Sequence, residues 1–235
     1  ALETLQDTSL QCHALHLADS NRESGIIAEL LALAASRGVP VRRHSREQLA
    51  RISKNGRQDQ GVALDVLCPA FSRLDDYLQQ LGDAAPQRLL ALDGINNPQN
   101  LGMIVRSAAA GNIDGIIWSR KGNAALGPLV IKASAGTLYR APLLLCPALP
   151  EALAECRDAG LEVCTLEADA ALSLFDYSPT EHCVFVLGNE TSGVSDKVSA
   201  LADRALAIPM KYGVESLNVA VTASLIAFSS TLVRR

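Results

Sequence analysis

The sequence predicts an α/β protein with a parallel sheet, preceded by a smaller α/β unit. Two observations predict this fold class. From position 88 onward, short apolar runs of strand length alternate with helical segments of roughly 10 to 18 residues, the pattern of strand–helix–strand crossovers. The chain is also 49% apolar and 20% charged over 235 residues, a composition typical of a globular protein with a substantial core. No internal repeat or low-complexity tract interrupts the alternation.

Residues 1–68 are predicted to form the smaller unit. Gly38 is expected to end its first helix, and Ser45 to cap its second through a hydroxyl that accepts from a free N–H group. Residues 69–87 end in turn-forming residues and are expected to be a linker with one short helix. The expected elements are a strand in LQCHALHLA, a helix in ESGIIAELLALAASRG, a strand in VPVRRH, a helix in SREQLARIS and a strand in GVALDVLC.

Residues 88–235 are predicted to form the unit with the parallel sheet. Its expected strands are RLLALDGI, IDGIIWS, LYRAPLLLC, LEVCTLE, HCVFVLGNE and RALAIPM. Its expected helices are NPQNLGMIVRSAAAGN, LGPLVIKASAG, LPEALAECRDAG and the segment 217–235. The first of these helices is opened by Asn-Pro and should close near Gly111.

Composition argues against several classes of protein and site. No apolar run reaches the roughly 18 residues of a membrane span, and the N-terminal stretch lacks the basic and apolar regions of a signal peptide. The six cysteines form no Cys-x-x-Cys pair. They lie mostly in apolar, strand-like surroundings, which indicates buried free thiols in a reducing cytoplasm. Four scattered histidines form no metal signature, so we expect no metal site.

A basic segment, residues 37–57, lies in the smaller unit. It carries seven Lys or Arg against one Glu, a net charge of +6 in a chain whose net charge is −4. A local basic surface on an acidic protein suits contact with a phosphate backbone, and the alternative is a solvated basic face without a ligand. The candidate RNA-binding cations are Arg37, Arg42, Arg43, Arg46, Arg51, Lys54 and Arg57.

Three polar turns follow predicted strands of the larger unit, at 92–108, 185–198 and 208–221. The carboxyl ends of parallel strands meet at one edge of a sheet, where ligands bind, so we expect the turns to gather there. Each turn has an ordinary alternative: an exposed arginine, a helix capped by Ser195 and a helix capped by Ser216. The candidate residues are Asn100, Gly102 and Arg106 in the first turn, Gly188, Asn189 and Glu190 in the second, and Glu215, Ser216 and Asn218 in the third.

Together the turns resemble the three motifs of the TrmH (SpoU) family, within the SPOUT class of RNA methyltransferases. The resemblance covers about residues 88–235. The family's N-x-G-x-x-x-R motif is met by Asn100, Gly102 and Arg106. Its apolar strand followed by L-G-x-E is met by Leu187, Gly188, Asn189 and Glu190. Its I-P-M, short loop and S-L-N-V are met by Ile208, Pro209, Met210, Ser216, Leu217, Asn218 and Val219.

The resemblance implies a deep trefoil knot, with the C-terminal helix threaded through a loop and S-adenosylmethionine bound in the knot. It implies methyl transfer to a ribose 2′-hydroxyl of RNA without a metal, by a homodimer formed through the knotted unit. The cofactor residues that it implies are Leu187, Gly188, Asn189, Ile208, Met210, Leu217 and Val219.

Arg106 is the catalytic residue that the resemblance implies. Because a guanidinium stays charged, we expect Arg106 to grip a phosphate and stabilise the developing alkoxide rather than to act as a base. Asn100 is expected to position Arg106 or the ribose, and Glu190 is expected to pair with Arg106 and orient it. Ser216 and Asn218 are expected to bind the ribose, the phosphate or Arg106.

The smaller unit resembles the L30e-like substrate-binding domain that many family members carry. Its segment RQDQGVALDV is similar to the family's H-Q-G-V, with Asp59 in place of the histidine and Gln60, Gly61 and Val62 present. This resemblance assigns RNA contact to the basic segment. It also favours ribosomal RNA over transfer RNA.

Other functions stay open. A knotted RNA-binding or ribosome-assembly protein without activity is the nearest alternative, although the complete set of motifs favours an enzyme. A base methyltransferase of a related knotted class is disfavoured because those families lack this combination of motifs. A dinucleotide-dependent oxidoreductase is disfavoured because G-x-G-x-x-G is absent after the first strand of the sheet, and the P-loop motif is absent too. The sequence leaves the methylated nucleotide, and a housekeeping or drug-resistance role, undecided.

Overall fold

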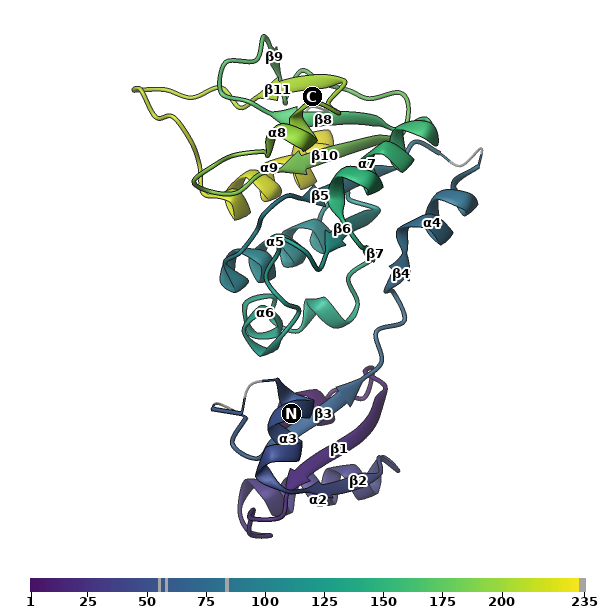
Figure 1. Ribbon diagram of the computed structural model, residues 1–235, viewed down its shortest axis with the longest axis vertical. Helices are drawn as coiled ribbons and strands as arrows, with labels where there is room; N and C mark the ends of the chain where they lie inside the picture. The colour runs from purple at the N-terminus through teal and green to yellow at the C-terminus, as the bar shows by residue number, and fades with distance from the viewer. Residues whose placement is uncertain (55, 58, 83–84, 233–235) are drawn as a thin grey trace. The chain divides into compact units, whose positions relative to one another are not determined.

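The computed structural model describes residues 1–54, 56–57, 59–82 and 85–232. The chain divides into two compact units, Ala1–Pro69 and Ala70–Arg235 (Figure 1). The predicted class, a parallel-sheet α/β unit preceded by a small α/β unit, is confirmed. No helix among the described residues is long and apolar enough to cross a membrane.

The first unit is built on a three-stranded sheet in the order β2–β1–β3. β1 (Cys12–Ala18) is parallel to β2 (Val41–His44) and antiparallel to β3 (Val62–Val66). The core packs α1 and α2 onto β1 through Leu5, Leu15, Leu17, Leu30 and Ala34. The helices are α1 (Leu2–Gln6), α2 (Ile26–Ser36) and α3 (Arg46–Ser53).

The predicted cap of α3 is confirmed. The Ser45 hydroxyl accepts from the Gln48 N–H at 3.2 Å, and the Gln48 side chain accepts from the Ser45 N–H at 3.0 Å. This reciprocal capping box satisfies two N–H groups at the start of the helix.

The second unit is built on an eight-stranded sheet in the order β4–β7–β6–β5–β10–β8–β11–β9, and all its pairings are parallel. The strands are β4 (Ser72–Arg73), β5 (Arg88–Leu92), β6 (Gly115–Ser119), β7 (Leu143–Cys146), β8 (Glu162–Leu166), β9 (Leu172–Ser173), β10 (Cys183–Leu187) and β11 (Arg204–Ala207). The helices are α4 (Leu74–Leu81), α5 (Pro98–Ala110), α6 (Pro128–Ala133), α7 (Leu149–Asp158), α8 (Asp196–Ser199) and α9 (Val219–Leu232), with a 3₁₀ turn η1 (Thr137–Tyr139).

Helices cover both faces of this sheet. On one face, α5, α6 and α9 pack on alternate residues of the central strands, such as Leu90 of β5 and Phe185 of β10. On the other face, α4, α7 and α8 pack on the intervening residues, such as Leu89 and Val184. β5, β6 and β10 are buried along their whole length, as expected for strands covered on both faces.

Several predicted elements differ from the structure. The strand expected in LYRAPLLLC is only Leu143–Cys146, because the Arg140 and Ala141 N–H groups turn back to the Thr137 carbonyl. The last helix begins at Val219 rather than at Leu217, and residues 233–235 of its predicted span lie outside the described residues.

Residues 70–87, expected to belong to a linker, lie in the second unit. β4 pairs with β7, and the predicted short helix is α4. The α4 leucines Leu74 and Leu81 are buried in the core beside Leu144 and Leu149. The segment LDDYLQQL is therefore an amphipathic helix that belongs to a helical layer of the second unit. The sequence analysis did not predict α1, β4 or β9.

Candidate active site

Three side chains from the three polar turns meet at one point. The Asn100 side chain lies between the other two: its Nδ2 donates to Glu190 Oε1, and its Oδ1 accepts from Asn218 Nδ2 at 3.3 Å. These contacts join residues 90 and 118 positions apart in the sequence. The turns that were expected to gather at one edge of the sheet are therefore in contact.

Asn100 is placed by the start of α5. The Asn97 side chain accepts from the Gln99 N–H at 2.8 Å, and Pro98 stands in the first turn, where its missing N–H costs nothing. Asn100 follows in the first turn of the helix and is only 7% exposed. Loss of a partner would leave part of a buried amide unsatisfied, so the contacts with Glu190 and Asn218 fix the relative positions of the three turns.

β10 ends in a tight glycine turn. Asn189 and Gly193 exchange two backbone hydrogen bonds of 2.9 Å. A Cβ on Gly188 would lie 2.2 Å from the Gly193 carbonyl carbon, so only glycine fits there. The Asn189 side chain accepts from the Thr191 N–H at 2.9 Å and donates to the Gly94 carbonyl at 2.7 Å. The Asn189 side chain therefore holds the second turn against the first.

Two further residues that the sequence analysis did not select support the site. Asp93 follows β5, and its carboxylate accepts from the Ser195 N–H at 2.7 Å. Asn123 follows β6; it donates to the Leu92 carbonyl at 3.0 Å and accepts from the Ile95 N–H at 2.8 Å. Both are polar residues placed shortly after a buried strand, which is the sequence signal that would have found them.

The third turn, between β11 and α9, is the most open of the three. Asn218 reaches the centre of the site and also caps α9, since its Oδ1 accepts from the Ala220 N–H at 2.9 Å. Ser216 is exposed and makes no hydrogen bond within the described chain, so the structure does not bring it to Asn100. Ser216 is therefore not the cap of the last helix.

The predicted cofactor residues differ in exposure. Leu187 and Val219 are buried at the ends of β10 and α9, whereas Leu217 is 36% exposed. Gly188, Asn189, Ile208 and Met210 are half-buried. Buried members of this set can shape a site, and exposed members can contact a ligand directly.

Arg106 lies on the exposed side of α5. It forms no ion pair with Glu190, contrary to the expectation, and no other ion pair within the described residues. The reason is helix geometry: Arg106 lies six positions after Asn100, which turns the two side chains about 120° apart. Arg106 lies one helical turn after Gly102. Gly102 packs closely on α6, since a Cβ added to this glycine would lie 2.6 Å from the α6 backbone.

Comparison with known proteins assigns this arrangement to a family. Residues 87–228 match the SpoU rRNA Methylase family. The chain belongs to the SpoU family of RNA methyltransferases. Residues 2–67 match a second family, described as RNA 2′-O ribose methyltransferase substrate binding. The expected resemblance is thus confirmed for both units.

Relatives and solved structures agree with the SpoU assignment. An uncharacterized tRNA/rRNA methyltransferase of Mycolicibacterium gilvum is 35% identical, over 91% of this chain and 68% of its own. A putative TrmH-family RNA methyltransferase of Porphyromonas gingivalis is 27% identical, with a TM-score of 0.67 over 97% of this chain and 84% of its own. The SpoU methyltransferase AviRb of Streptomyces viridochromogenes, in complex with AdoMet, shares the fold with 23% identity and a TM-score of 0.69, over 98% of this chain and 86% of its own.

The cations of the SpoU substrate-binding unit fall into three groups. Arg37 is half-buried, and its guanidinium donates to main-chain carbonyls, including that of Leu5 at 2.7 Å. Its bonds hold α1 in place, so its visible role is structural. Arg43 pairs with Glu23, and Arg46 pairs with Asp59. The exposed cations without an ion pair among the described residues are Arg42, Arg51, Lys54 and Arg57.

Neither unit presents a metal centre among its described residues. Groups of three or more His, Cys, Asp or Glu side chains with metal-binding geometry are absent from that part of the chain. The described polar groups of the SpoU site include side-chain amides, the carboxylates of Asp93 and Glu190, and the guanidinium of Arg106. This set can hold and orient polar ligands and stabilise negative charge.

Proposed function

We propose that this SpoU-family protein transfers a methyl group from S-adenosylmethionine to a ribose 2′-hydroxyl of RNA, with ribosomal RNA as the preferred substrate. The observation that carries the proposal is the contact of Asn100 with Glu190 and Asn218, which joins one residue from each of the three motifs. The matches to the SpoU rRNA Methylase family and to a 2′-O ribose methyltransferase substrate-binding family support both the ribose and the ribosomal RNA.

The chemistry of the loop between β11 and α9 fits a nucleoside cofactor. Val214 and Leu217 expose apolar side chains, 49% and 36% accessible. Among described residues, the one backbone hydrogen bond internal to this loop joins Val214 to Lys211 at 3.2 Å, which leaves other backbone groups for a ligand. Bound S-adenosylmethionine supplies the methyl group as an electrophile on its sulfonium. The residues that would hold it are Leu187, Gly188, Asn189, Ile208, Met210, Leu217 and Val219.

Arg106 acts on the ribose and phosphate in this proposal. The hydroxyl is a weak nucleophile: its oxygen would bond to the methyl carbon while the carbon–sulfur bond of the cofactor breaks, and its proton would pass to solvent water. A guanidinium remains charged and cannot easily accept that proton, but it can bind the neighbouring phosphate and stabilise the developing alkoxide. Its freedom from ion pairs in the described chain leaves the full charge of Arg106 available to RNA.

Glu190 and Asn218 have positioning roles in the proposal. Because the carboxylate accepts from Asn100, it is held at the end of β10 instead of neutralising Arg106. Asn218 is held at the start of α9 by the same amide. Ser216 is left free to contact the RNA ribose or phosphate. Much of the rate of an in-line displacement comes from such placement of the two reactants.

The proposal includes the trefoil knot and a homodimer formed through the second unit. β11 lies on the far side of β8 from the centre of the sheet. From β11 the chain returns through residues 208–218 to α9, which packs against α5. A C-terminal helix that is threaded through a loop has to return across the sheet in this way. Large apolar side chains are exposed on the helical layer that contains α9, which supports self-association. They are Met103 of α5, Leu129 of α6, and Val221 and Phe228 of α9.

The proposal is tested by methyl transfer to ribosomal RNA from cells that lack the protein, followed by mass spectrometry of nucleosides. We expect 2′-O-methylated ribose. Arg106→Ala should lower the transfer rate by about a hundredfold or more, because an electrostatic contact to the transition state is lost. Binding of S-adenosylhomocysteine, measured by calorimetry, should survive.

Arg157→Ala on α7 is the matched control, since it removes a partly exposed arginine from the opposite helical layer and should leave turnover intact. Methyl groups on bases would contradict the ribose assignment. RNA binding without any transfer would favour the alternative, a non-catalytic RNA-binding protein.

A further inference from the structure

The first unit contains a buried carboxylate, that of Asp59, directly after its basic segment of residues 37–57. The Asp59 side chain is only 4% exposed, although it lies two residues after the exposed Arg57. Its ion-pair partner, Arg46, is 56% exposed. A buried negative charge reduces the attraction of this surface for phosphate, so its presence calls for a different physical role.

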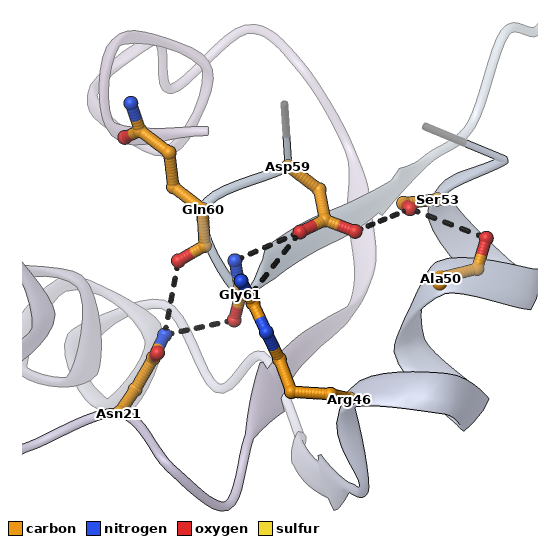
Figure 2. A network of polar contacts seen from close by, with 7 residues as sticks. All are labelled: Asn21, Arg46, Ala50, Ser53, Asp59, Gln60 and Gly61. Atoms are coloured by element: carbon orange, nitrogen blue, oxygen red, sulfur yellow. Dashed lines mark hydrogen bonds and ion pairs between the residues drawn. The ribbon is translucent and has the colours of Figure 1, made fainter. Parts of the chain in front are cut away.

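Hydrogen bonds fold the chain around Asp59 (Figure 2). One carboxylate oxygen accepts from the Ser53 hydroxyl at 2.6 Å, at the end of α3. The other accepts from the Gly61 N–H at 2.9 Å and lies 3.5 Å from the Arg46 guanidinium. The Ser53 and Gly61 bonds lower the pKa of Asp59, in that order of importance. The carboxylate therefore ties the end of α3 to the start of β3.

Asn21 holds the same turn from its other side. Its Nδ2 donates to the Gly61 carbonyl at 2.9 Å and to the Gln60 carbonyl at 3.4 Å. A Cβ on Gly61 would lie 2.5 Å from the Asn21 side chain, so a larger residue would push Asn21 away from the turn and break these hydrogen bonds. Figure 2 shows the two sets of bonds meeting at Gly61.

Gln60 is the residue that this arrangement presents to solvent. Its φ of 51° lies in the left-handed region, which is uncommon for a residue other than glycine. Its backbone is fixed on both sides, but within the described chain its carboxamide makes no hydrogen bond. In Figure 2 the carboxamide points away from Asp59. A free amide on a rigid turn can bind a ligand with little loss of entropy.

We infer that Asp59 is a positioning residue for RNA recognition, and that the group it positions is the Gln60 carboxamide, which contacts an RNA nucleotide. An amide can donate to and accept from a base edge or a ribose hydroxyl, whereas the neighbouring cations can contact only acceptors such as phosphate. The inference rests on the proposed function, because it needs RNA to bind to the first unit.

Charge provides a sharp test, because Asp59→Asn and Glu47→Gln each remove one negative charge from the same region. Glu47 is exposed on α3 and belongs to no site, so Glu47→Gln should leave RNA binding unchanged or tighten it. Asp59→Asn weakens the bonds that fold the turn, and we expect it to loosen RNA binding by about fivefold. A purely electrostatic role for Asp59 predicts tightening in both variants.

The measurement is fluorescence anisotropy of the full chain with a labelled, unstructured RNA of about 20 nucleotides, longer than common single-strand sites. Gln60→Gly removes the carboxamide and suits the left-handed backbone. It should weaken binding while leaving the salt dependence unchanged. Arg46→Ala should reduce the salt slope by about one ion, as expected for a phosphate contact.

Each outcome bears either on the inference about Asp59 and Gln60 or on the proposed function. Loosening in Asp59→Asn and Gln60→Gly, but not in Glu47→Gln, supports the inference. Unchanged or tighter binding by either of the first two variants overturns it, provided that the unaltered protein binds. Gln60→Gly keeps Asp59 in place, so it remains decisive if Asp59→Asn does not fold. No binding by the unaltered protein overturns RNA binding in the proposed function, and this inference with it.

Discussion

A side-chain amide can donate and accept at the same time, and the site uses both abilities of Asn100. A carboxylate at this position could only accept, and it would face Glu190 with a second negative charge. A serine would be too short to reach both partners. An amide at the first position of the N-x-G-x-x-x-R motif is therefore needed to bind Glu190 and Asn218, one residue from each of the other two turns.

Asn100→Asp tests this argument at the residue scale. At neutral pH the variant should lose about 1–3 kcal/mol of unfolding free energy, because a carboxylate at the buried position 100 would lose its solvation and be repelled by the carboxylate of the exposed Glu190. Burial and repulsion raise the pKa of the introduced carboxyl group in the folded state, so the loss should shrink as the pH falls towards 5. Urea denaturation at several pH values measures this.

The exposed neighbour provides the control for that experiment. Gln99→Glu introduces the same charge into the first turn of α5, where a negative charge is favourable, and should be nearly neutral. A loss of stability in Asn100→Asp that does not depend on pH would contradict the proposed repulsion.

The cysteines allow a second test at the residue scale. All six are free thiols. Burial raises the pKa of Cys164 to about 11 and that of Cys183 to about 12. Because the thiolate is the reactive form, both should resist iodoacetamide at pH 8 in the folded protein and react only after unfolding. Half-buried Cys12 and Cys68 should be labelled earlier, as mass spectrometry of peptides can show. Early labelling of Cys164 would contradict its burial.

At the scale of elements, close contact between α5 and its neighbours sets the position of the motif residues. Gly102 faces α6, and Gly111 faces α9, where a Cβ would lie 2.6 Å from the Ala227 Cβ. The Asn112 N–H also donates to the Ala227 carbonyl at 2.8 Å. The missing side chains allow α5 to lie against two helices, and this placement directs Asn100 to the strand ends.

Gly102→Ala should disturb this packing. Its Cβ would lie 2.5 Å from the Ala133 Cβ and 2.6 Å from the Val130 carbonyl, so the α6 backbone must move. We expect a loss of about 1–3 kcal/mol of unfolding free energy, typical of overpacking. Gly127→Ala is the control, because its Cβ would meet nothing closer than 3.8 Å. Equal stability of the two variants would contradict the close packing of α5 on α6.

On the scale of the whole molecule, a buried arginine joins the start of the central strand β5 to the last helix. Arg88 begins β5 and is 7% exposed. It donates to the Ile226 carbonyl at 2.8 Å and the Ser229 hydroxyl at 3.0 Å, and its guanidinium lies 4.9 Å from the Phe185 ring centre. These contacts hold α9 against the sheet, and α9 carries Asn218 at its start.

Arg88→Lys should therefore destabilise the second unit by about 2–4 kcal/mol, because an ammonium cannot reproduce the planar set of donors. Arg73→Lys is the control: Arg73 is 71% exposed in a surface ion pair, so its replacement should change stability much less than that of Arg88. Guanidinium denaturation followed by circular dichroism compares the two. A small effect of Arg88→Lys would show that apolar packing alone holds α9.

The sequence alone determined the alternation of strands and helices, the Ser45 cap and the three polar turns, because these depend on neighbouring residues. It also determined the family, through motifs with fixed spacing. Only the tertiary structure decided that Glu190 binds Asn100 rather than Arg106, that Arg37 supports α1, and that residues 70–87 join the large sheet. Those outcomes depend on contacts between distant segments, and local periodicity carries no information about which distant partner a side chain meets.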